Sequence, residues 1–138
     1  MTEAVFLDSG IFIAFLNRND QWHTQAKALF SLARPRWSTS YLVIGEAYSW
    51  FLHRYGEEAA RSFRLLVDKL ALDGLKLHDV TAEHHRHVEK MLDRLRGAKV
   101  SYVDASSLCL LERHKIRKVW STDFHLSLTG AEVAPRRS

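Results

Sequence analysis

The sequence predicts an α/β fold, a three-layer sandwich in which a short, mostly parallel β-sheet is flanked by helices. Short, apolar, β-favouring segments such as Ala4–Leu7 and Lys118–Ser121 alternate along the chain with longer segments of helical apolar spacing. The hydrophobic fraction of 46% and the charged fraction of 26% are ordinary for a globular protein. The length of 138 residues suits one domain, which we expect to cover residues 1–138.

Each element is predicted from its local pattern. The first strand ends at Asp8, and Ser9-Gly10 is expected to turn the chain into a short helix. The predicted strands are 4–7, 36–39, 75–78, 118–121 and 132–134. The predicted helices are 11–16, 22–32, 41–54, 57–72, 82–96 and 103–114.

Several of these helices carry boundary signals. Ser40 and Thr81 precede helical segments and are predicted N-caps, because their hydroxyls can accept a hydrogen bond from a free backbone N–H group. Gly56 is predicted to separate two helices, and Gly97 to end the helix that follows Thr81.

Bulk properties limit the functional classes. The net charge of +4 favours polyanionic partners, although the basic residues also fit solvated helix faces. Cys109 is the single cysteine, so an intramolecular disulfide is impossible and a reducing, cytoplasmic location is expected. No segment approaches the roughly 20 uninterrupted apolar residues of a membrane span, and no signal peptide is expected.

Four acidic residues lie in apolar surroundings. Asp8 and Asp123 each follow a predicted strand, whereas Glu46 and Asp104 lie on predicted helices. Each also has a structural explanation: a helix cap for Asp8, a turn or cap for Asp123, a first-turn acid for Asp104, and solvent or an arginine partner for Glu46.

Together, these acids indicate a metal site. In parallel α/β sheets, sites form beyond the carboxyl ends of the strands, where the four side chains can converge. Carboxylates that are brought close together repel one another, and a divalent cation removes that repulsion. Ligation by oxygen alone favours Mg²⁺ or Mn²⁺ over Zn²⁺.

The same segments carry a resemblance to a known family. Phe6–Gly10, Tyr41–Glu46, Ser101–Ser106 and Ser121–His125, in this order and spacing, resemble the PIN-domain nucleases, in particular VapC-like toxin ribonucleases. Asp8, Glu46 and Asp104 match the three core acids of the family, and Asp123 matches a less uniform fourth. Where some relatives carry a further acid, this chain has His125, so the fourth ligand and the metal count stay open.

The resemblance implies a PIN-like fold and a function. It implies endonucleolytic cleavage of RNA with one or two Mg²⁺ or Mn²⁺ ions, giving a 5′-phosphate and a 3′-hydroxyl. It also implies a cognate antitoxin partner and a homodimer. Asp8, Glu46, Asp104 and Asp123 would be the catalytic metal ligands. Ser9 and Thr122 would orient carboxylates, and Ser107 could hydrogen-bond Asp104.

Other features are assigned structural roles. His84, His85 and His87 invite a zinc site, but no cysteine cluster accompanies them, and a solvated or partner-facing helix is expected. Cys109 is expected in the core, and His125 in a structural role, although it could contact a phosphate. The four tryptophans are expected mainly in the core, with base stacking as the alternative: Trp22, Trp37, Trp50 and Trp120.

Two other functional classes fit parts of the sequence. An α/β phosphatase or phospho-receiver would use Asp8 as nucleophile, but Ser9-Gly10-Ile11 lacks the second aspartate that such a phosphatase needs. A non-catalytic RNA-binding module would not need all four acids. A housekeeping RNA-processing role and a DNA substrate both remain open, and the sequence does not predict the RNA target.

Overall fold

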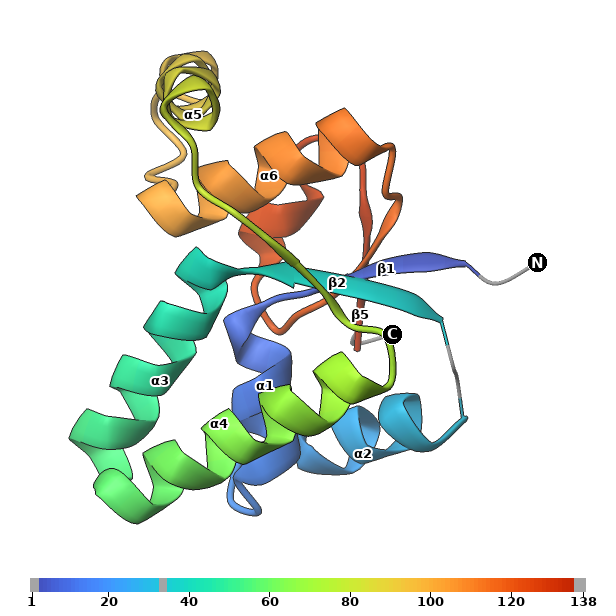
Figure 1. The fold of residues 1–138 in the computed structure, drawn as a ribbon. Coiled ribbons are helices and arrows are strands. Elements are labelled where there is room, and N and C mark those ends of the chain that lie inside the picture. The colour runs from blue at the N-terminus through green and yellow to red at the C-terminus, as the bar shows by residue number, and fades with distance from the viewer. Residues whose placement is uncertain (1–2, 33–34, 136–138) are drawn as a thin grey trace.

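The chain forms a five-stranded sheet covered by helices on both faces, as a computed structural model describes it for residues 3–32 and 35–135 (Figure 1). The strands are β1 (Ala4–Leu7), β2 (Arg36–Ser40), β3 (Lys76–His78), β4 (Lys118–Trp120) and β5 (Glu132–Ala134). The helices are α1 (Ser9–Leu16), α2 (His23–Leu32), α3 (Tyr41–Tyr55), α4 (Glu57–Leu72), α5 (Ala82–Arg94), α6 (Tyr102–His114) and the 3₁₀ helix η1 (Phe124–Ser127).

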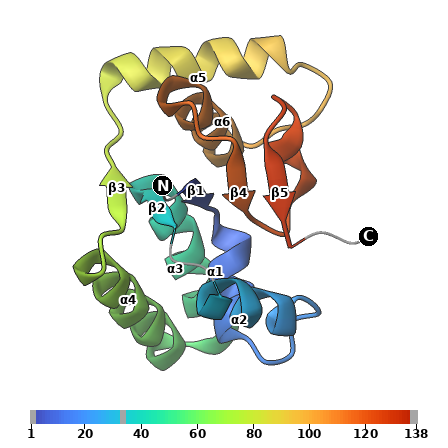
Figure 2. The same ribbon diagram turned by 90° about the vertical axis from the view of Figure 1, so that its right-hand side faces the viewer.

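The sheet has the strand order β3-β2-β1-β4-β5, and all of its pairings are parallel. β1 is central, with Phe6 opposite Ser38 of β2 and Val119 of β4. The helices α5 and α6 lie on one face of the sheet, and α1 to α4 lie on the other (Figures 1 and 2). The predicted α/β three-layer sandwich is therefore confirmed, and the sheet is parallel throughout.

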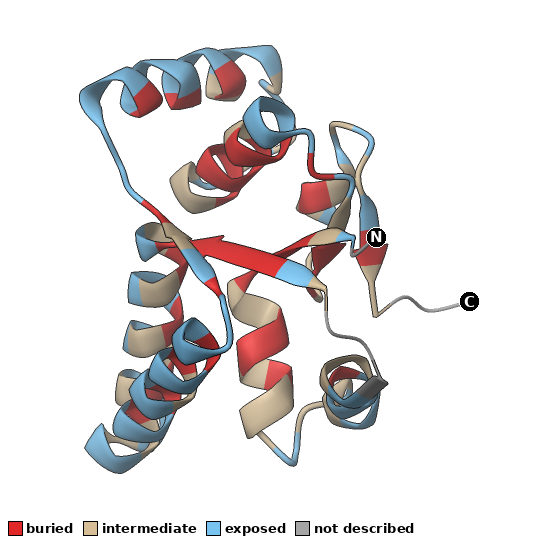
Figure 3. Cartoon of the chain, turned by 45° about the vertical axis from the view of Figure 1, so that its right-hand side comes forward, coloured by how far each residue is buried: buried red, intermediate tan, exposed pale blue. Residues whose placement is uncertain are grey.

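Burial is concentrated on the sheet and on the helix faces turned towards it (Figure 3). Phe6 and Leu7 of β1 are fully buried, as expected for a central parallel strand that is covered on both sides. On the α1–α4 face, Phe63 contacts Phe12 and Phe51 at ring-centroid distances of 5.4 and 5.5 Å. This aromatic cluster fixes α1, α3 and α4 relative to one another.

The two predicted N-caps are confirmed. Ser40 Oγ accepts a hydrogen bond from the Val43 N–H group at 3.2 Å, and Thr81 Oγ1 accepts one from the His84 N–H group at 3.0 Å. These caps satisfy backbone donors that have no partner within the helix.

Other boundaries differ from the prediction. Ser9 and Gly10 are the first residues of α1, where a turn was predicted, because Asp8 already has the extended backbone of an N-cap residue. α5 ends at Arg94, earlier than predicted, and Gly97 with φ 96° belongs to the turn that follows. η1 was not predicted, since its four residues are too few to show a helical period.

No helix in the described part of the chain is both long and apolar enough to cross a membrane.

Gly10 provides the first test. A β-carbon built at Gly10 would overlap Thr122 Oγ1 and lie 3.1 Å from the Thr122 amide nitrogen, whereas one at Gly45 meets nothing within 4 Å. We expect Gly10→Ala to lower the free energy of unfolding by about 1–3 kcal/mol, because the Thr122 backbone must move. The matched control Gly45→Ala should raise it by up to about 1 kcal/mol through helix propensity. Urea unfolding of both variants would measure this, and equal effects would contradict the close approach.

Candidate active site

Asp8 lies at the carboxyl end of the central strand and is only 2% exposed. Its backbone N–H donates to the Trp120 carbonyl at 3.0 Å, which joins the ends of β1 and β4. Its carboxylate Oδ2 accepts a hydrogen bond from Ser121 Oγ at 2.7 Å. The other oxygen, Oδ1, is buried without a hydrogen-bond partner among the described residues. Although Asp8 holds the N-cap position of α1, its side chain makes no capping hydrogen bond, so capping does not explain this buried carboxylate.

Ser121 links two of the predicted acids. Its hydroxyl donates to Asp8 and accepts from the Asp123 backbone N–H at 2.9 Å. The sequence analysis did not single out Ser121. The sequence pattern that could have indicated it is a serine at the end of a strand, two residues before an acid. A hydroxyl in that position can bridge the ends of neighbouring strands.

Asp104, Asp123 and His125 form a compact group. One ligand atom of each lies within 4.8 Å of the others, which would allow them to hold one metal ion. His125 Nδ1 lies 3.4 Å from Asp104 Oδ2 and 3.4 Å from Asp123 Oδ1. Asp123 also accepts the His125 backbone N–H at 2.9 Å, so it caps η1 and positions His125. His125 therefore belongs to the candidate site, and its predicted structural role was incomplete.

Glu46 lies on the exposed side of α3, where its carboxylate accepts a hydrogen bond from Ser9 Oγ at 2.6 Å. Asp8 and Glu46 are not part of the compact group, but the Glu46 charge raises the pKa of Asp104, and the Asp104 charge raises the pKa of Asp8. Their role as metal ligands stays a prediction.

The three predicted orienting hydroxyls differ in what they contact. Ser9 has the contact to Glu46 that such a role needs. Within the described ranges, Thr122 makes no hydrogen bond to a carboxylate and instead packs against Gly10. Ser107 is fully buried, and its hydroxyl has no partner there, so the predicted hydrogen bond to Asp104 is absent. The Asp104 carboxylate instead lies beside His125 and Asp123 of the loop after β4.

Asp8 and Asp104 both have raised pKa values. Burial, above all, raises the pKa of Asp8 from 3.8 to about 7; the Asp104 and Glu46 carboxylates add to this, while the Ser121 hydrogen bond opposes it. Burial and the neighbouring Asp123 carboxylate raise the pKa of Asp104 from 3.8 to about 6. Both shifts show a site in which negative charge lacks compensation from nearby cationic side chains.

This donor set fits a hard divalent cation. Asp8 offers a buried oxygen without a partner, Asp104 and Asp123 offer adjacent carboxylates, and His125 offers an imidazole nitrogen. Oxygen-rich ligation of this kind suits Mg²⁺ or Mn²⁺, and one imidazole is compatible with Mn²⁺.

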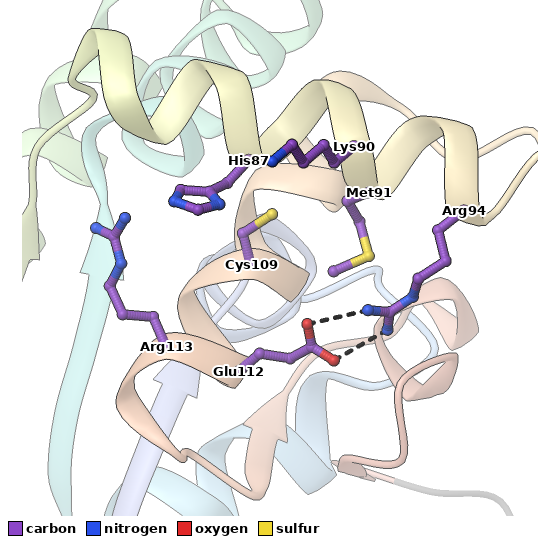
Figure 4. Close-up of a pocket in the computed structure, with 7 residues that line it drawn as sticks. All are labelled: His87, Lys90, Met91, Arg94, Cys109, Glu112 and Arg113. Atoms are coloured by element: carbon purple, nitrogen blue, oxygen red, sulfur yellow. Dashed lines mark hydrogen bonds and ion pairs between the residues drawn. The ribbon is translucent and has the colours of Figure 1, made fainter.

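A separate hollow of about 500 Å³ lies between α5 and α6 and contains none of the predicted acids (Figure 4). A bidentate ion pair between Arg94 and Glu112, with a shortest distance of 2.9 Å, crosses one side of it. Cys109 lines this hollow and is only partly buried, so its predicted core position was wrong in part: it borders the core but faces the space between the helices.

The histidines of α5 do not form a metal cluster within the part of the chain that the structure describes. His84 is buried, and its Nε2 lies 2.7 Å from Ser106 Oγ, which corrects the expectation of a solvated or partner-facing residue. The helical period places it on the inner face of α5 with Val88 and Met91. His85 and His87 are exposed, as expected.

The tryptophans divide into two pairs. Trp37 and Trp120 belong to the core, as predicted, and their rings pack together at a centroid distance of 6.3 Å. Trp22 and Trp50 are only partly buried and pack against the core from outside.

Fold and acidic cluster together define a class of protein. A family model described as "PIN domain" matches residues 5–131, and the chain belongs to the PIN domain family.

Within this class, the chain is similar to a toxin of Mycobacterium tuberculosis. It is 27% identical over 132 residues to the "23S rRNA-specific endonuclease VapC20", covering 95% of this chain and 98% of the relative. The crystal structure of VapC20, described as a "Sarcin-Ricin loop cleaving toxin", superposes with a TM-score of 0.84 at 26% identity, covering 93% of this chain and 96% of that one. VapBC2 from Rickettsia felis shares the fold with a TM-score of 0.67 at 13% identity, covering 94% of this chain and 96% of that one.

The Ser121 bridge can be tested against a matched serine. Ser121 and Ser107 are both fully buried, but only Ser121 makes hydrogen bonds. We expect Ser121→Ala to lower metal affinity or activity by about 10–100-fold and the free energy of unfolding by about 1–3 kcal/mol. Ser107→Ala should be near neutral in both, because it removes a hydroxyl without a partner. Calorimetric Mn²⁺ titration and urea unfolding would decide, and equal effects would contradict the bridge.

The raised pKa of Asp8 predicts a pH dependence of stability. A carboxyl whose pKa is about 7 when folded and 3.8 in its ordinary state stabilises the fold at acidic pH. This contribution is complete below about pH 3.8 and is lost as pH rises through about 7. In metal-free buffer, the melting temperature of Asp8→Asn relative to the wild type should therefore increase between pH 5 and pH 8. A difference that is constant with pH would show that Asp8 is not perturbed.

Proposed function

We propose that this chain is an endoribonuclease that depends on Mg²⁺ or Mn²⁺ and acts as the toxin of a type II toxin–antitoxin pair. The observation that carries the metal-dependent chemistry is the buried Oδ1 of Asp8, which has no hydrogen-bond partner among the described residues, together with the neighbouring Asp104, Asp123 and His125 group. A buried carboxylate oxygen is costly to leave without a partner, and a cation at the end of β1 would supply one.

Asp8, Asp104 and Asp123 would hold the metal, with Glu46 close enough to influence both buried acids through its charge. When bound, a divalent cation activates water for attack on a phosphodiester and offsets charge on the leaving oxygen. Ser121 holds Asp8 through Oδ2 and thereby leaves Oδ1 free for ligation. Asp123 positions the His125 backbone, and Ser9 holds the Glu46 carboxylate.

RNA as the substrate is supported by the relative. VapC20, which matches nearly the full chain, is named for cleavage of 23S rRNA. The net charge of +4 also favours a polyanionic substrate, which the basic residues outside the acidic site would attract. The sarcin–ricin loop that VapC20 cleaves is the first RNA target to test.

The partner proposals follow from the same likeness. VapC20 is described as a toxin, and a structure of the same fold from Klebsiella pneumoniae is a toxin–antitoxin complex. We therefore include a protein antitoxin as a partner, together with a homodimeric state and a cytoplasmic location. Each of these is separate from the chemistry of the acids, and none is needed for the cleavage test below.

Cleavage should require both the metal and Asp104. Protein purified free of any partner would be incubated with a 23S rRNA fragment that contains the sarcin–ricin loop, and with a mixed RNA pool, in Mg²⁺, Mn²⁺ or EDTA. We expect cutting in either metal, none in EDTA, and about a thousandfold loss in Asp104→Asn, since a ligand to the cation is removed.

The melting temperature of Asp104→Asn should equal or exceed that of the wild type, because the substitution removes a destabilised charge. Cutting that survives both EDTA and Asp104→Asn would contradict the proposed site. Loss of the fold in this variant would contradict the view that Asp104 serves catalysis and not stability.

A further inference from the structure

A groove lies along the side of α1 and α3, and Glu46 is the one of the four acids that lines it. It has a volume of about 580 Å³, and the two residues of the Ser9–Glu46 hydrogen bond both line it. Its lining is Ser9, Ile13, Glu46, Ser49, Trp50, His53 and Arg54. Because α3 begins where β2 ends and runs away from the sheet (Figure 1), the α3 residues from Glu46 to Arg54 lie progressively farther from that end of the sheet.

The α3 residues of this lining share one face of the helix. Glu46, Trp50 and Arg54 are spaced four residues apart, which places them above one another on successive turns. At 1.5 Å per residue, the axial distance from Glu46 to Arg54 is about 12 Å. An RNA strand that is bound at the acids and follows α3 would therefore reach Arg54 within a short extended segment of its backbone.

Trp50 is held in place by aromatic neighbours. Its ring meets Phe51 edge-on at a centroid distance of 5.2 Å and Tyr55 at 5.7 Å. Phe51 is itself buried in the aromatic cluster described above. The indole is thus anchored to the core of the α1–α4 layer, while one part of it remains open to the groove.

The Arg54 guanidinium lies over this anchored ring, with Cζ 5.5 Å from the ring centroid. A cation over an indole face is stabilised, so Trp50 restricts the positions of an otherwise flexible side chain. No carboxylate pairs with Arg54 in residues 3–32 and 35–135, and the one acid in the groove, Glu46, is bonded to Ser9. The guanidinium is therefore free to donate to an anion from outside the protein.

We propose that Arg54 binds a backbone phosphate of the RNA strand whose cleaved phosphodiester lies at the acids, and that Trp50 is the positioning residue for this contact. This inference rests on the proposed function. The planar guanidinium matches the geometry of a phosphate and can donate two parallel hydrogen bonds. An acidic protein segment would offer similar chemistry, but Glu46 and Ser9 of the proposed site line the same groove as Arg54, which favours the substrate strand.

Binding would be measured in an Asp104→Asn background, so that the RNA stays intact, using the fluorescence anisotropy of a labelled single-stranded RNA of mixed sequence. We expect Arg54→Gln to weaken binding about tenfold at moderate salt, as for loss of one charge-assisted contact. The slope of log affinity against log salt should become shallower by about 0.7, the value for one phosphate contact on a single strand.

Two further substitutions separate positioning from folding. Trp50→Phe should keep most of the affinity and the full salt slope, whereas Trp50→Ala should lose part of both, because the support for the guanidinium is gone. Arg117→Gln is the matched control: Arg117 is an exposed arginine that precedes β4 and so lies at the opposite edge of the sheet from the acids. It should leave affinity and slope unchanged.

Affinity and salt slope in Arg54→Gln equal to those of the parent protein would overturn the proposal, even where the wild type cleaves RNA. Unchanged RNA binding together with weaker binding of a poly-glutamate probe would overturn it in favour of an acidic protein partner. Failure of the wild type to cleave RNA in any metal is a different result and counts against the proposed function itself.

Discussion

The burial of one carboxylate at the end of the central strand is the constraint on which the site depends. β1 is paired on both sides, and Asp8 follows it into a position from which solvent is nearly excluded. An aspartate there opposes folding unless its charge is compensated. Ser121 supplies a side-chain hydrogen bond to one oxygen, Oδ2, and the other oxygen, Oδ1, has no hydrogen-bond partner in the described chain. The Asp104 and Glu46 carboxylates make the negative charge of Asp8 still less favourable, and the proposed metal site rests on this uncompensated charge.

Strand pairing and aromatic packing hold the elements that carry the acids in place. Parallel pairing brings the ends of β1, β2 and β4 to one edge of the sheet, and aromatic packing of Phe12, Phe51 and Phe63 fixes the helices that leave this edge. Like-charged groups would otherwise move apart. Favourable packing in the core therefore offsets the repulsion between the acids and keeps them close together.

Sequence reasoning predicted the features that depend on local pattern. The strands were short apolar runs, and the helices had clear periods and caps. Asp8 and Asp123 became candidate site residues because each follows a predicted strand, and their role stays a prediction. Sequence reasoning failed where the outcome depends on contacts between distant segments. Ser121 donates a hydrogen bond to Asp8 across a sequence separation of 113 residues, and no local signal specifies that pairing.

For Ser107, a local signal was misleading. Its spacing from Asp104 suggested a hydrogen bond, but the Asp104 carboxylate lies beside His125 of η1 instead. Cys109 and His84 were misplaced because their positions depend on how α5 crosses α6.

The close approach of α1 to the loop after β4 has a consequence for how such sequences can change over time. Gly10 leaves no room for a side chain beside Thr122, and the neighbours of these residues, Ser9 and Ser121, each hold a carboxylate of the site. A lineage that enlarges residue 10 must therefore also alter residue 122, or accept displaced acids. Positions 10 and 122 are thus expected to co-vary among relatives that keep the four acids, and to drift independently in those that have lost them.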